Sequence, residues 1–151
     1  STPEWTPARL RSINARFANA SPQEVLNWAD KTFSKWAQIT SFGPTGMVIL
    51  DQMSKMQLLP RVPVVTIDTL HLFPETYALV KQVQMHYDPK LDDLHTYKPQ
   101  NASDLATFDL TYGSLLWQAN PERYGYLTKV EPTQRALKEL GLQAWVTGRR
   151  R

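Results

Sequence analysis

Residues 62–69 read VPVVTIDT, and this stretch decides the predicted fold class. Residues 62–67 form a near-continuous apolar run with β-branched side chains, which is typical of a strand buried on both faces of a parallel sheet. Asp68 and Thr69 end the run. Apolar residues recur at helical spacing before it, over residues 47–56, and after it, from Pro74 onward. Strand and helix therefore alternate, and this order predicts an α/β fold with a mainly parallel sheet and helices on both faces.

Segments farther from this strand continue the alternation. Ser21, Pro22 and Glu24 predict a helix start, because Ser caps a helix, Pro suits its first position and Glu completes a capping box. Asn101 is expected to cap a helix over residues 103–112 that Gly113 stops. Further strands are predicted over residues 38–42, 94–97 and 144–147, a further helix over residues 132–140, and a loop over residues 120–125. Residues 1–20 are expected to form an N-terminal arm or short helix, and residues 21–151 one domain.

The composition is that of an ordinary globular protein. Of the 151 residues, 42% are hydrophobic and 21% are charged, with a net charge of +3. No run approaches the roughly 18 to 20 apolar residues of a membrane helix, and the N-terminus does not resemble a secretory signal. We therefore expect a soluble, cytoplasmic protein with no membrane partner. Nucleic acid is not an expected partner either, because the basic residues form no stripe interleaved with aromatic residues.

The lack of cysteine restricts the chemistry. The chain has no Cys, so these residues supply no disulfide, no thiolate nucleophile and no Cys-ligated zinc or iron–sulfur centre. His71, His86 and His95 do not have the spacing of metal ligands and are expected to be structural. His71 alone lies in a loop where it could contact a ligand.

Three loops are candidates for a binding site, because ligands of open parallel sheets bind at the C-terminal ends of the strands. They are residues 41–46 (SFGPTG), residues 68–71 (DTLH) and residues 147–151 (TGRRR). The first is a strand-to-helix turn whose backbone N–H groups would face an anion. It is not a P-loop, because no Lys-Ser/Thr pair follows it. Lys129 precedes a predicted helix and could reach a phosphate.

Each of these features also has a plain structural interpretation. The first loop could be an ordinary turn, and Asp68 could cap the next segment. Lys129 could be a surface partner of Glu131, and the arginines of residues 149–151 could be a solvated tail. The coincidence of three such loops at strand ends favours a binding site more than any one of them does.

The loops and the segments around them resemble those of the phosphoadenylyl-sulfate (PAPS) and adenylyl-sulfate reductases. The matching motifs are, in order, Ser41-Phe42-Gly43, Ile67-Asp68-Thr69, Leu72-Phe73-Pro74-Glu75-Thr76-Tyr77, Pro121-Glu122-Arg123, Lys129-Val130-Glu131-Pro132 with Arg135-Ala136-Leu137, and Trp145-Val146-Thr147-Gly148-Arg149-Arg150-Arg151. Each motif is short, but their order and spacing over residues 41–151 make the resemblance specific. The motifs are most similar to those of fungal members.

The resemblance implies an adenine nucleotide α-hydrolase-like fold for residues 21–151. It also implies reduction of PAPS to sulfite and adenosine 3′,5′-bisphosphate, with thioredoxin as the electron donor, and a possible homodimer. The first loop would hold phosphate, the second would line the nucleoside pocket, and the basic residues would face the phosphate and sulfate, whose oxygens suit guanidinium forks. The residues that it assigns to substrate binding are Ser41, Phe42, Gly43, Thr45, Gly46, Asp68, Thr69, Lys129, Thr147, Gly148, Arg150 and Arg151.

Two departures narrow the resemblance. Tyr124 and Gly125 stand where the cluster-containing adenylyl-sulfate reductases place a Cys pair, so no iron–sulfur cofactor is expected and the cluster-free PAPS branch is favoured. The family's nucleophile is a Cys in a C-terminal motif beyond the arginine loop, and these residues contain no Cys. We therefore expect a truncated chain that supplies the substrate-binding part and cannot complete a turnover alone.

Two other functions remain open. One is a different enzyme of the same fold, an ATP pyrophosphatase or an adenylyltransferase. Phe42 and Pro44 replace positions that cradle pyrophosphate in those enzymes, but a preference for ATP over adenosine 3′,5′-bisphosphate would support this function. The other is a nucleotide-binding or protein-interaction module without catalysis of its own.

Overall fold

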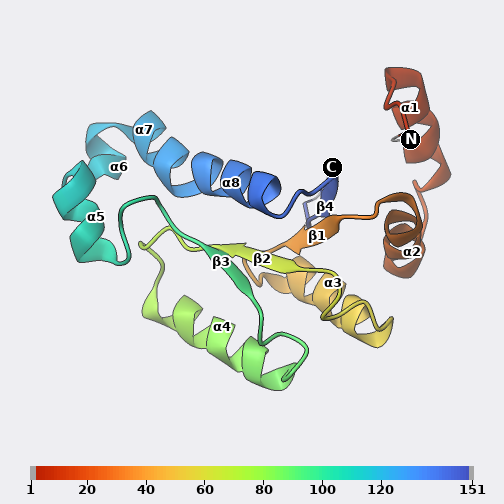
Figure 1. Cartoon of the computed structure of the whole chain (residues 1–151), viewed down its shortest axis with the longest axis horizontal. Helices are drawn as coiled ribbons and strands as arrows, with labels where there is room; N and C mark the ends of the chain where they lie inside the picture. The colour runs from red at the N-terminus through yellow and green to blue at the C-terminus, as the bar shows by residue number, and fades with distance from the viewer. Residues whose placement is uncertain (1–2, 150–151) are drawn as a thin grey trace.

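The strands form one parallel sheet in the computed structural model, which describes residues 3–149. They are β1 (Trp36–Ile39), β2 (Val64–Ile67), β3 (His95–Tyr97) and β4 (Ala144–Val146), in the order β3-β2-β1-β4. The parallel pairings have the registers Gln38↔Val64, Val65↔His95 and Trp36↔Ala144. The chain moves from β1 outward to β2 and β3, and then returns to place β4 on the other side of β1 (Figure 1). The sheet therefore changes its direction of growth at β1.

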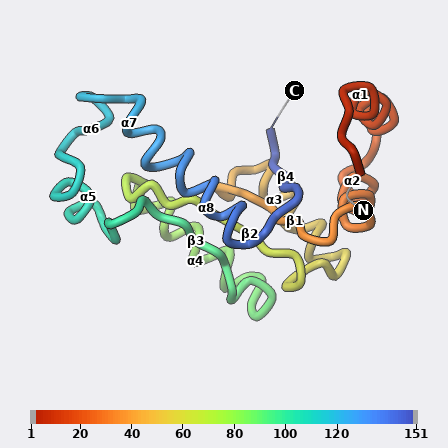
Figure 2. Tube along the Cα trace, turned by 45° about the horizontal axis from the view of Figure 1, so that its top comes forward, coloured from red at the N-terminus to blue at the C-terminus, as the bar shows by residue number. Residues whose placement is uncertain are grey.

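Helices cover both faces of this sheet (Figures 1 and 2). The first face packs against α2 (Pro22–Thr32), α3 (Pro44–Lys55) and α4 (Pro74–His86), and the second against α8 (Glu131–Glu139). Side chains alternate along each strand, so Trp36 and Val64 lie in the core of the first face while Ala37 and Val65 lie in that of the second. The predicted α/β fold, with a parallel sheet and helices on both faces, is confirmed.

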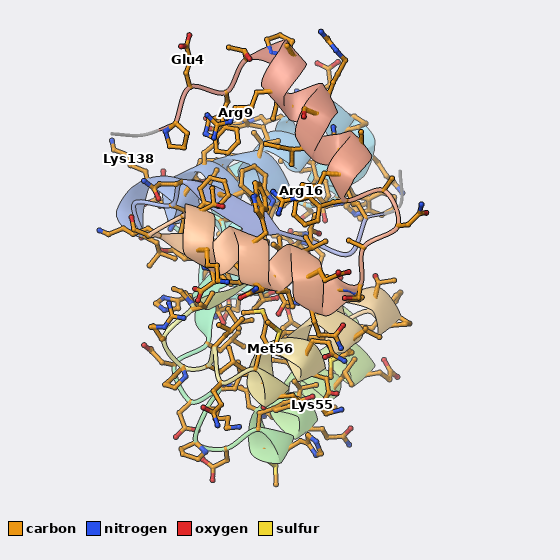
Figure 3. All side chains as sticks on the ribbon, turned by 90° about the vertical axis from the view of Figure 1, so that its right-hand side faces the viewer. Glu4, Arg9, Arg16, Lys55, Met56 and Lys138 are labelled. Atoms are coloured by element: carbon orange, nitrogen blue, oxygen red, sulfur yellow. The ribbon has the colours of Figure 1, made fainter. Side chains whose placement is uncertain are left out.

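Helix α1 (Pro7–Arg16) packs on α2 through aromatic side chains. The ring centroids of Trp5 and Phe33 lie 5.5 Å apart, and those of Phe17 and Trp28 lie 5.3 Å apart. The guanidinium groups of Arg9 and Arg16 lie over the rings of Trp5 and Phe17, each 5.0 Å from the ring centroid. Both arginines are labelled in the side view (Figure 3). Helix α1 has no buried residue of its own, and this aromatic cluster packs it against the domain.

The far end of the molecule from α1 is a group of short helices (Figures 1 and 2). It comprises α5 (Leu105–Tyr112), α6 (Leu116–Ala119), α7 (Pro121–Gly125) and the π-helix η1 (Tyr126–Val130), which runs directly into α8. A small satellite core of Leu70, Phe108 and Leu116 holds this group together. It connects the short helices to the loop that follows β2.

The capping pattern matches the prediction at one helix and corrects it at another. The Ser21 hydroxyl oxygen accepts a hydrogen bond from Glu24 N–H at 3.2 Å, and the Glu24 carboxylate accepts one from Ser21 N–H at 2.7 Å. These two bonds confirm the capping box. The prediction that Asn101 caps the next helix is wrong. Asp104 caps α5 instead, accepting from Thr107 N–H at 2.8 Å, and Asn101 lies outside the helix with φ 60°.

The predicted loop over residues 120–125 is also wrong, because residues 121–125 form α7. Asn120 caps this helix by accepting a hydrogen bond from Arg123 N–H at 3.2 Å, and Pro121 occupies its first position. The predicted stop at Gly113 is confirmed, since this residue has φ 98° at the end of α5. Among residues 3–149, no helix combines the length and the apolar character needed to span a bilayer.

Candidate functional site

A cavity of about 540 Å³ lies at the C-terminal ends of β1, β2 and β4. We call it the strand-end cavity. It is located where the sheet changes its direction of growth, which is the usual ligand position in open α/β sheets. Eight of the predicted site residues line it, namely Ser41, Gly43, Thr45, Gly46, Thr69, Lys129, Thr147 and Gly148.

Strands β1 and β2 end in the same kind of turn at this cavity. After β1, Thr40 Oγ1 accepts a hydrogen bond from Phe42 N–H at 3.0 Å, and after β2, Asp68 Oδ1 accepts one from Leu70 N–H at 2.8 Å. Phe42 has φ 62° and Leu70 has φ 66°, so both lie in the left-handed region that non-glycine residues seldom adopt. Their side chains are only 3% and 7% exposed, and this burial helps to hold the strained backbone.

These turns determine which predicted residues reach the cavity. The middle residues of the two turns, Ser41 and Thr69, line it. The side chain of Phe42 is directed instead into the main core, and the carboxylate of Asp68 is buried and engaged by Leu70 N–H and the Tyr77 hydroxyl. The structure therefore places neither the Phe42 ring nor the Asp68 carboxylate in the cavity wall, contrary to what the loop motifs imply.

The N-terminus of α3 supplies free backbone donors. Its cap residue, Gly43, has no side chain to satisfy them, and the first helical hydrogen bond runs from Met47 N–H to Gly43 O at 2.9 Å. The N–H groups of Thr45 and Gly46 in the first turn therefore have no acceptor within the helix. Such groups at the positive end of a helix favour an anion.

Close packing of α3 on β1 fixes the position of these donors. A Cβ atom on Gly46 would lie 2.2 Å from Thr40 Oγ1, so only glycine fits there. The buried side chain of Gln38 donates a hydrogen bond from Nε2 to Gly46 O at 2.8 Å. Gln38 of β1 and Thr40, the residue after this strand, thus both contact the first turn of α3.

The loop after β4 contacts the loop after β1. The Thr45 hydroxyl donates to Gly148 O at 3.0 Å, and a Cβ atom on Gly148 would lie 2.3 Å from Thr45 Oγ1. Glycine at position 148 is therefore required by this close approach. The contact joins the first and third predicted loops, which confirms that they come together at one edge of the sheet.

The charged groups at the cavity are basic. Lys129 lies exposed on η1, and Arg149 lies exposed after β4. Glu131 pairs with Arg135 at 3.0 Å within α8, so the structural interpretation that it pairs with Lys129 is wrong. The described lining residues include no Asp or Glu. Arg150 and Arg151, which were also predicted to bind substrate, lie outside the described residues.

His71 has a structural position beside the cavity. Its Nδ1 lies 2.6 Å from Thr69 O, and its ring makes T-shaped contacts with the rings of Phe108 and Tyr124 at centroid distances of 4.8 and 5.1 Å. Burial raises the pKa of the Tyr124 hydroxyl, an effect that a hydrogen bond from Thr69 partly offsets. Residues 3–149 bring together no group of three His, Asp or Glu side chains suited to a metal ion.

Five lining residues were missed by the sequence analysis: Ile39, Thr40, Ile67, Leu72 and Arg149. Ile39 and Ile67 are the last residues of β1 and β2, and with Leu72 they give the cavity an apolar part. Extending each of the first two candidate loops by two residues toward its N-terminus would have found three of the five, Ile39, Thr40 and Ile67. Arg149 belongs to a loop that was predicted, although only its neighbours were selected.

Comparison with known proteins gives one consistent family. Residues 35–151 match the phosphoadenosine phosphosulfate reductase domain. The chain is 42% identical over 133 residues to the phosphoadenosine phosphosulfate reductase of Saccharomyces cerevisiae, covering 87% of this chain and 51% of that protein. It is 40% identical over 150 residues to the Emericella nidulans protein of the same name, covering 97% of this chain and 48% of that protein.

A solved structure agrees with these relatives. The crystal structure of phosphoadenylyl-sulfate (PAPS) reductase from Candida auris, a phosphate complex, superposes with a TM-score of 0.88 and 44% sequence identity. The match covers all of this chain and 71% of that chain. The chain spans about half the length of the curated relatives it matches. By its sequence and its fold, this chain belongs to the phosphoadenosine phosphosulfate reductase domain family.

Proposed function

We propose that this chain is the substrate-binding part of a reductase that converts 3′-phosphoadenylyl sulfate to sulfite and adenosine 3′,5′-bisphosphate in sulfate assimilation. The observation that carries this proposal is the strand-end cavity, which combines free helix N–H groups, hydroxyl side chains and two basic side chains. Such donors match the phosphate and sulfate oxygens of this substrate. The family and the names of the relatives support the same substrate.

The cavity suits a nucleotide whose charged end is bound by α3. The N–H groups of Thr45 and Gly46 and the hydroxyl of Ser41 would donate to phosphate oxygens, with Lys129 as a mobile positive charge. Ile39 and Ile67 would contact the nucleoside, because apolar strand ends suit a base or a ribose face. The described lining has no carboxylate that would repel the anion.

The chemical step requires a thiol from outside these 151 residues, because they contain no Cys. The thiolate would attack the sulfur of the substrate, breaking the bond between sulfur and the bridging oxygen, and adenosine 3′,5′-bisphosphate would leave with the bonding electron pair. A thioredoxin thiolate would next attack the sulfur of the reductase cysteine in the resulting S-sulfonate and release sulfite. A mixed disulfide would form, and the second thioredoxin thiol would then resolve it. The role of this chain is to hold the nucleotide during these exchanges.

The finer features of this function are part of the same proposal. Tyr124 and Gly125 occupy the positions of a Cys pair in cluster-containing relatives, so the proposed enzyme works without an iron–sulfur cluster. Thioredoxin is the proposed electron donor, the cytoplasm the proposed location and a homodimer the proposed assembly. The phosphate in the Candida auris complex supports an anion-binding site in the family.

Calorimetric titration of the chain with adenosine 3′,5′-bisphosphate, adenosine 5′-monophosphate and ATP tests the proposal. We expect the bisphosphate to bind most tightly and its affinity to fall as salt is raised, because charged donors supply much of the binding. Absence of binding by a chain with a folded circular dichroism spectrum would refute the proposal. Preference for ATP would instead favour an ATP pyrophosphatase or an adenylyltransferase. Incubation with PAPS and reduced thioredoxin should release no sulfite from this chain alone.

A further inference from the structure

The loop between β2 and α4, residues 68–73, forms one wall of the strand-end cavity. Thr69 and Leu72 line the cavity, whereas Leu70 between them is turned into the satellite core at φ 66°. The loop therefore directs Thr69 and Leu72 to the cavity, and Leu70 and His71 between them toward Phe108 in the satellite core. Such a backbone holds its shape only where other groups fix it.

A tyrosine hydroxyl from α4 is one of these groups. Tyr77 OH donates to Asp68 Oδ1 at 2.7 Å, and the same oxygen accepts from Leu70 N–H at 2.8 Å. Asp68 is in turn bound to β3, since its N–H donates to Tyr97 O at 2.8 Å. Phe73 offers no side-chain cap to α4, so the Tyr77 hydroxyl is a polar side-chain link from the first turn of this helix back to the end of β2.

The Tyr77 hydroxyl remains a donor throughout the physiological pH range. Burial raises the pKa of Tyr77 to about 12, and the hydrogen bond to Asp68 acts in the same direction, whereas the backbone of Leu72 acts in the opposite one. The hydrogen bond between Tyr77 and Asp68 therefore joins the first turn of α4 to the end of β2, on either side of the loop that carries Thr69 and Leu72.

We propose that Tyr77 is a positioning residue for the nucleotide pocket: through Asp68, its hydroxyl holds Thr69 and Leu72 at the cavity wall. Tyr77 itself does not line the cavity, so it acts through the loop and not by touching the ligand. This inference rests on the proposed function, because it assumes that the strand-end cavity is the nucleotide site.

The opposite end of the same helix provides a matched control. Tyr87, which ends α4, donates from its hydroxyl to Asp51 Oδ1 at 3.1 Å. Burial is the main cause that raises the pKa of Tyr87, and the hydrogen bond to the Asp51 carboxylate raises it further, just as burial and Asp68 raise the pKa of Tyr77. Neither Tyr87 nor Asp51 lines the cavity. Tyr87→Phe therefore removes the same kind of hydrogen bond without touching the loop.

The test compares the full chain with its Tyr77→Phe and Tyr87→Phe variants. Adenosine 3′,5′-bisphosphate affinity is measured by calorimetry, stability by urea unfolding, and loop order by hydrogen exchange of peptides covering residues 68–73. We expect Tyr77→Phe to bind about fivefold more weakly, with faster loop exchange, since one hydrogen bond changes an equilibrium by about two- to tenfold. Tyr87→Phe should lose similar stability and keep its affinity within about twofold.

The outcomes separate this inference from the proposed function. If the unmodified chain binds the bisphosphate and Tyr77→Phe binds it equally well, the assignment of Tyr77 is overturned and the proposed function stands. An equal loss of affinity in both variants would also overturn the assignment, because it would be a general effect of stability. Unchanged exchange in residues 68–73 would overturn it even if Tyr77→Phe failed to bind. If the unmodified folded chain binds no bisphosphate, both proposals are overturned.

Discussion

Replacement of Gly46 by alanine tests whether the close packing of α3 on β1 sets the geometry of the anion site. The new Cβ would lie 2.2 Å from Thr40 Oγ1, and an ordinary van der Waals contact begins at 3.4 Å, so the two groups must separate by about 1.2 Å. Thr40 Oγ1 accepts a hydrogen bond from Phe42 N–H at 3.0 Å, and Thr40 N–H donates to Val65 O at 2.9 Å, so we expect α3 to be the element that moves. That movement also stretches the hydrogen bond from Gln38 Nε2 to Gly46 O.

The expected loss of stability is about 2 kcal/mol. Overpacking costs about 1–3 kcal/mol and a weakened hydrogen bond about 1 kcal/mol, while alanine regains up to about 1 kcal/mol through its helix propensity. For a domain of this size, the loss corresponds to about 4–8 °C in melting temperature. Affinity for adenosine 3′,5′-bisphosphate should fall by at least about tenfold, because displaced N–H groups no longer face the anion.

Urea unfolding and calorimetric titration measure the two effects, and Gly43→Ala is the control for the effect on stability. Position 43 lies in the same loop, but a Cβ there meets nothing within 4 Å, so stability should change by less than about 1 kcal/mol. In a Thr40→Ala background the clashing hydroxyl is gone, and the Gly46→Ala change should become milder by about 1 kcal/mol or more. Wild-type stability and affinity for Gly46→Ala would refute the packing argument.

Two further predictions concern charged residues. Lys129→Ala should weaken adenosine 3′,5′-bisphosphate binding by about tenfold and flatten the salt dependence of this binding, whereas Lys129→Arg should retain most of the affinity. Lys138→Ala is the control, because Lys138 lies on α8 and outside the cavity lining. Equal affinities of all three variants would contradict the prediction. The hydrogen bonds from Arg61 and Trp36 hold the pKa of Asp30 below its usual range, although burial opposes them. This stabilisation is present above the ordinary pKa near 4 and is lost as pH falls through the lower folded value. Thermal unfolding should therefore show that Asp30→Asn lowers the free energy of unfolding by at most about 1 kcal/mol at pH 7, and that this loss disappears in acid. A loss that persists at the lowest pH would contradict the prediction.

Residues of the candidate site were predictable where the residues next to them in the sequence identify the end of a strand. Ser41, Thr45 and Thr69 lie in loops that follow apolar β-prone segments, and all three line the cavity. Phe42 and Asp68 belong to the same motifs but are directed away from it, because each turn reverses the backbone at a residue with positive φ. A motif identifies the turn, whereas the backbone dihedral angles decide which side chain of the turn reaches the ligand.

The sequence was also insufficient to predict the ion-pair partner of Glu131. Lys129 and Glu131 are neighbours in sequence, yet the π-helical turn and the start of α8 place Glu131 toward Arg135 and leave Lys129 at the cavity. Arg135 also lies over the Tyr97 ring at 5.6 Å, so its family motif contributes to packing against β3. Sequence separation alone did not distinguish these partners.

By itself, the sequence determined the alternation of strands and helices, the capping box at Ser21 and the loops that end the strands. These features depend on hydrophobic periodicity and turn residues within a few positions, so they can be deduced without knowledge of the fold. Only the tertiary structure placed β4 beside β1 and brought Thr45 to Gly148, 103 residues away. Such contacts are chosen by close packing between elements, in which one Cβ atom at Gly46 or Gly148 would not fit.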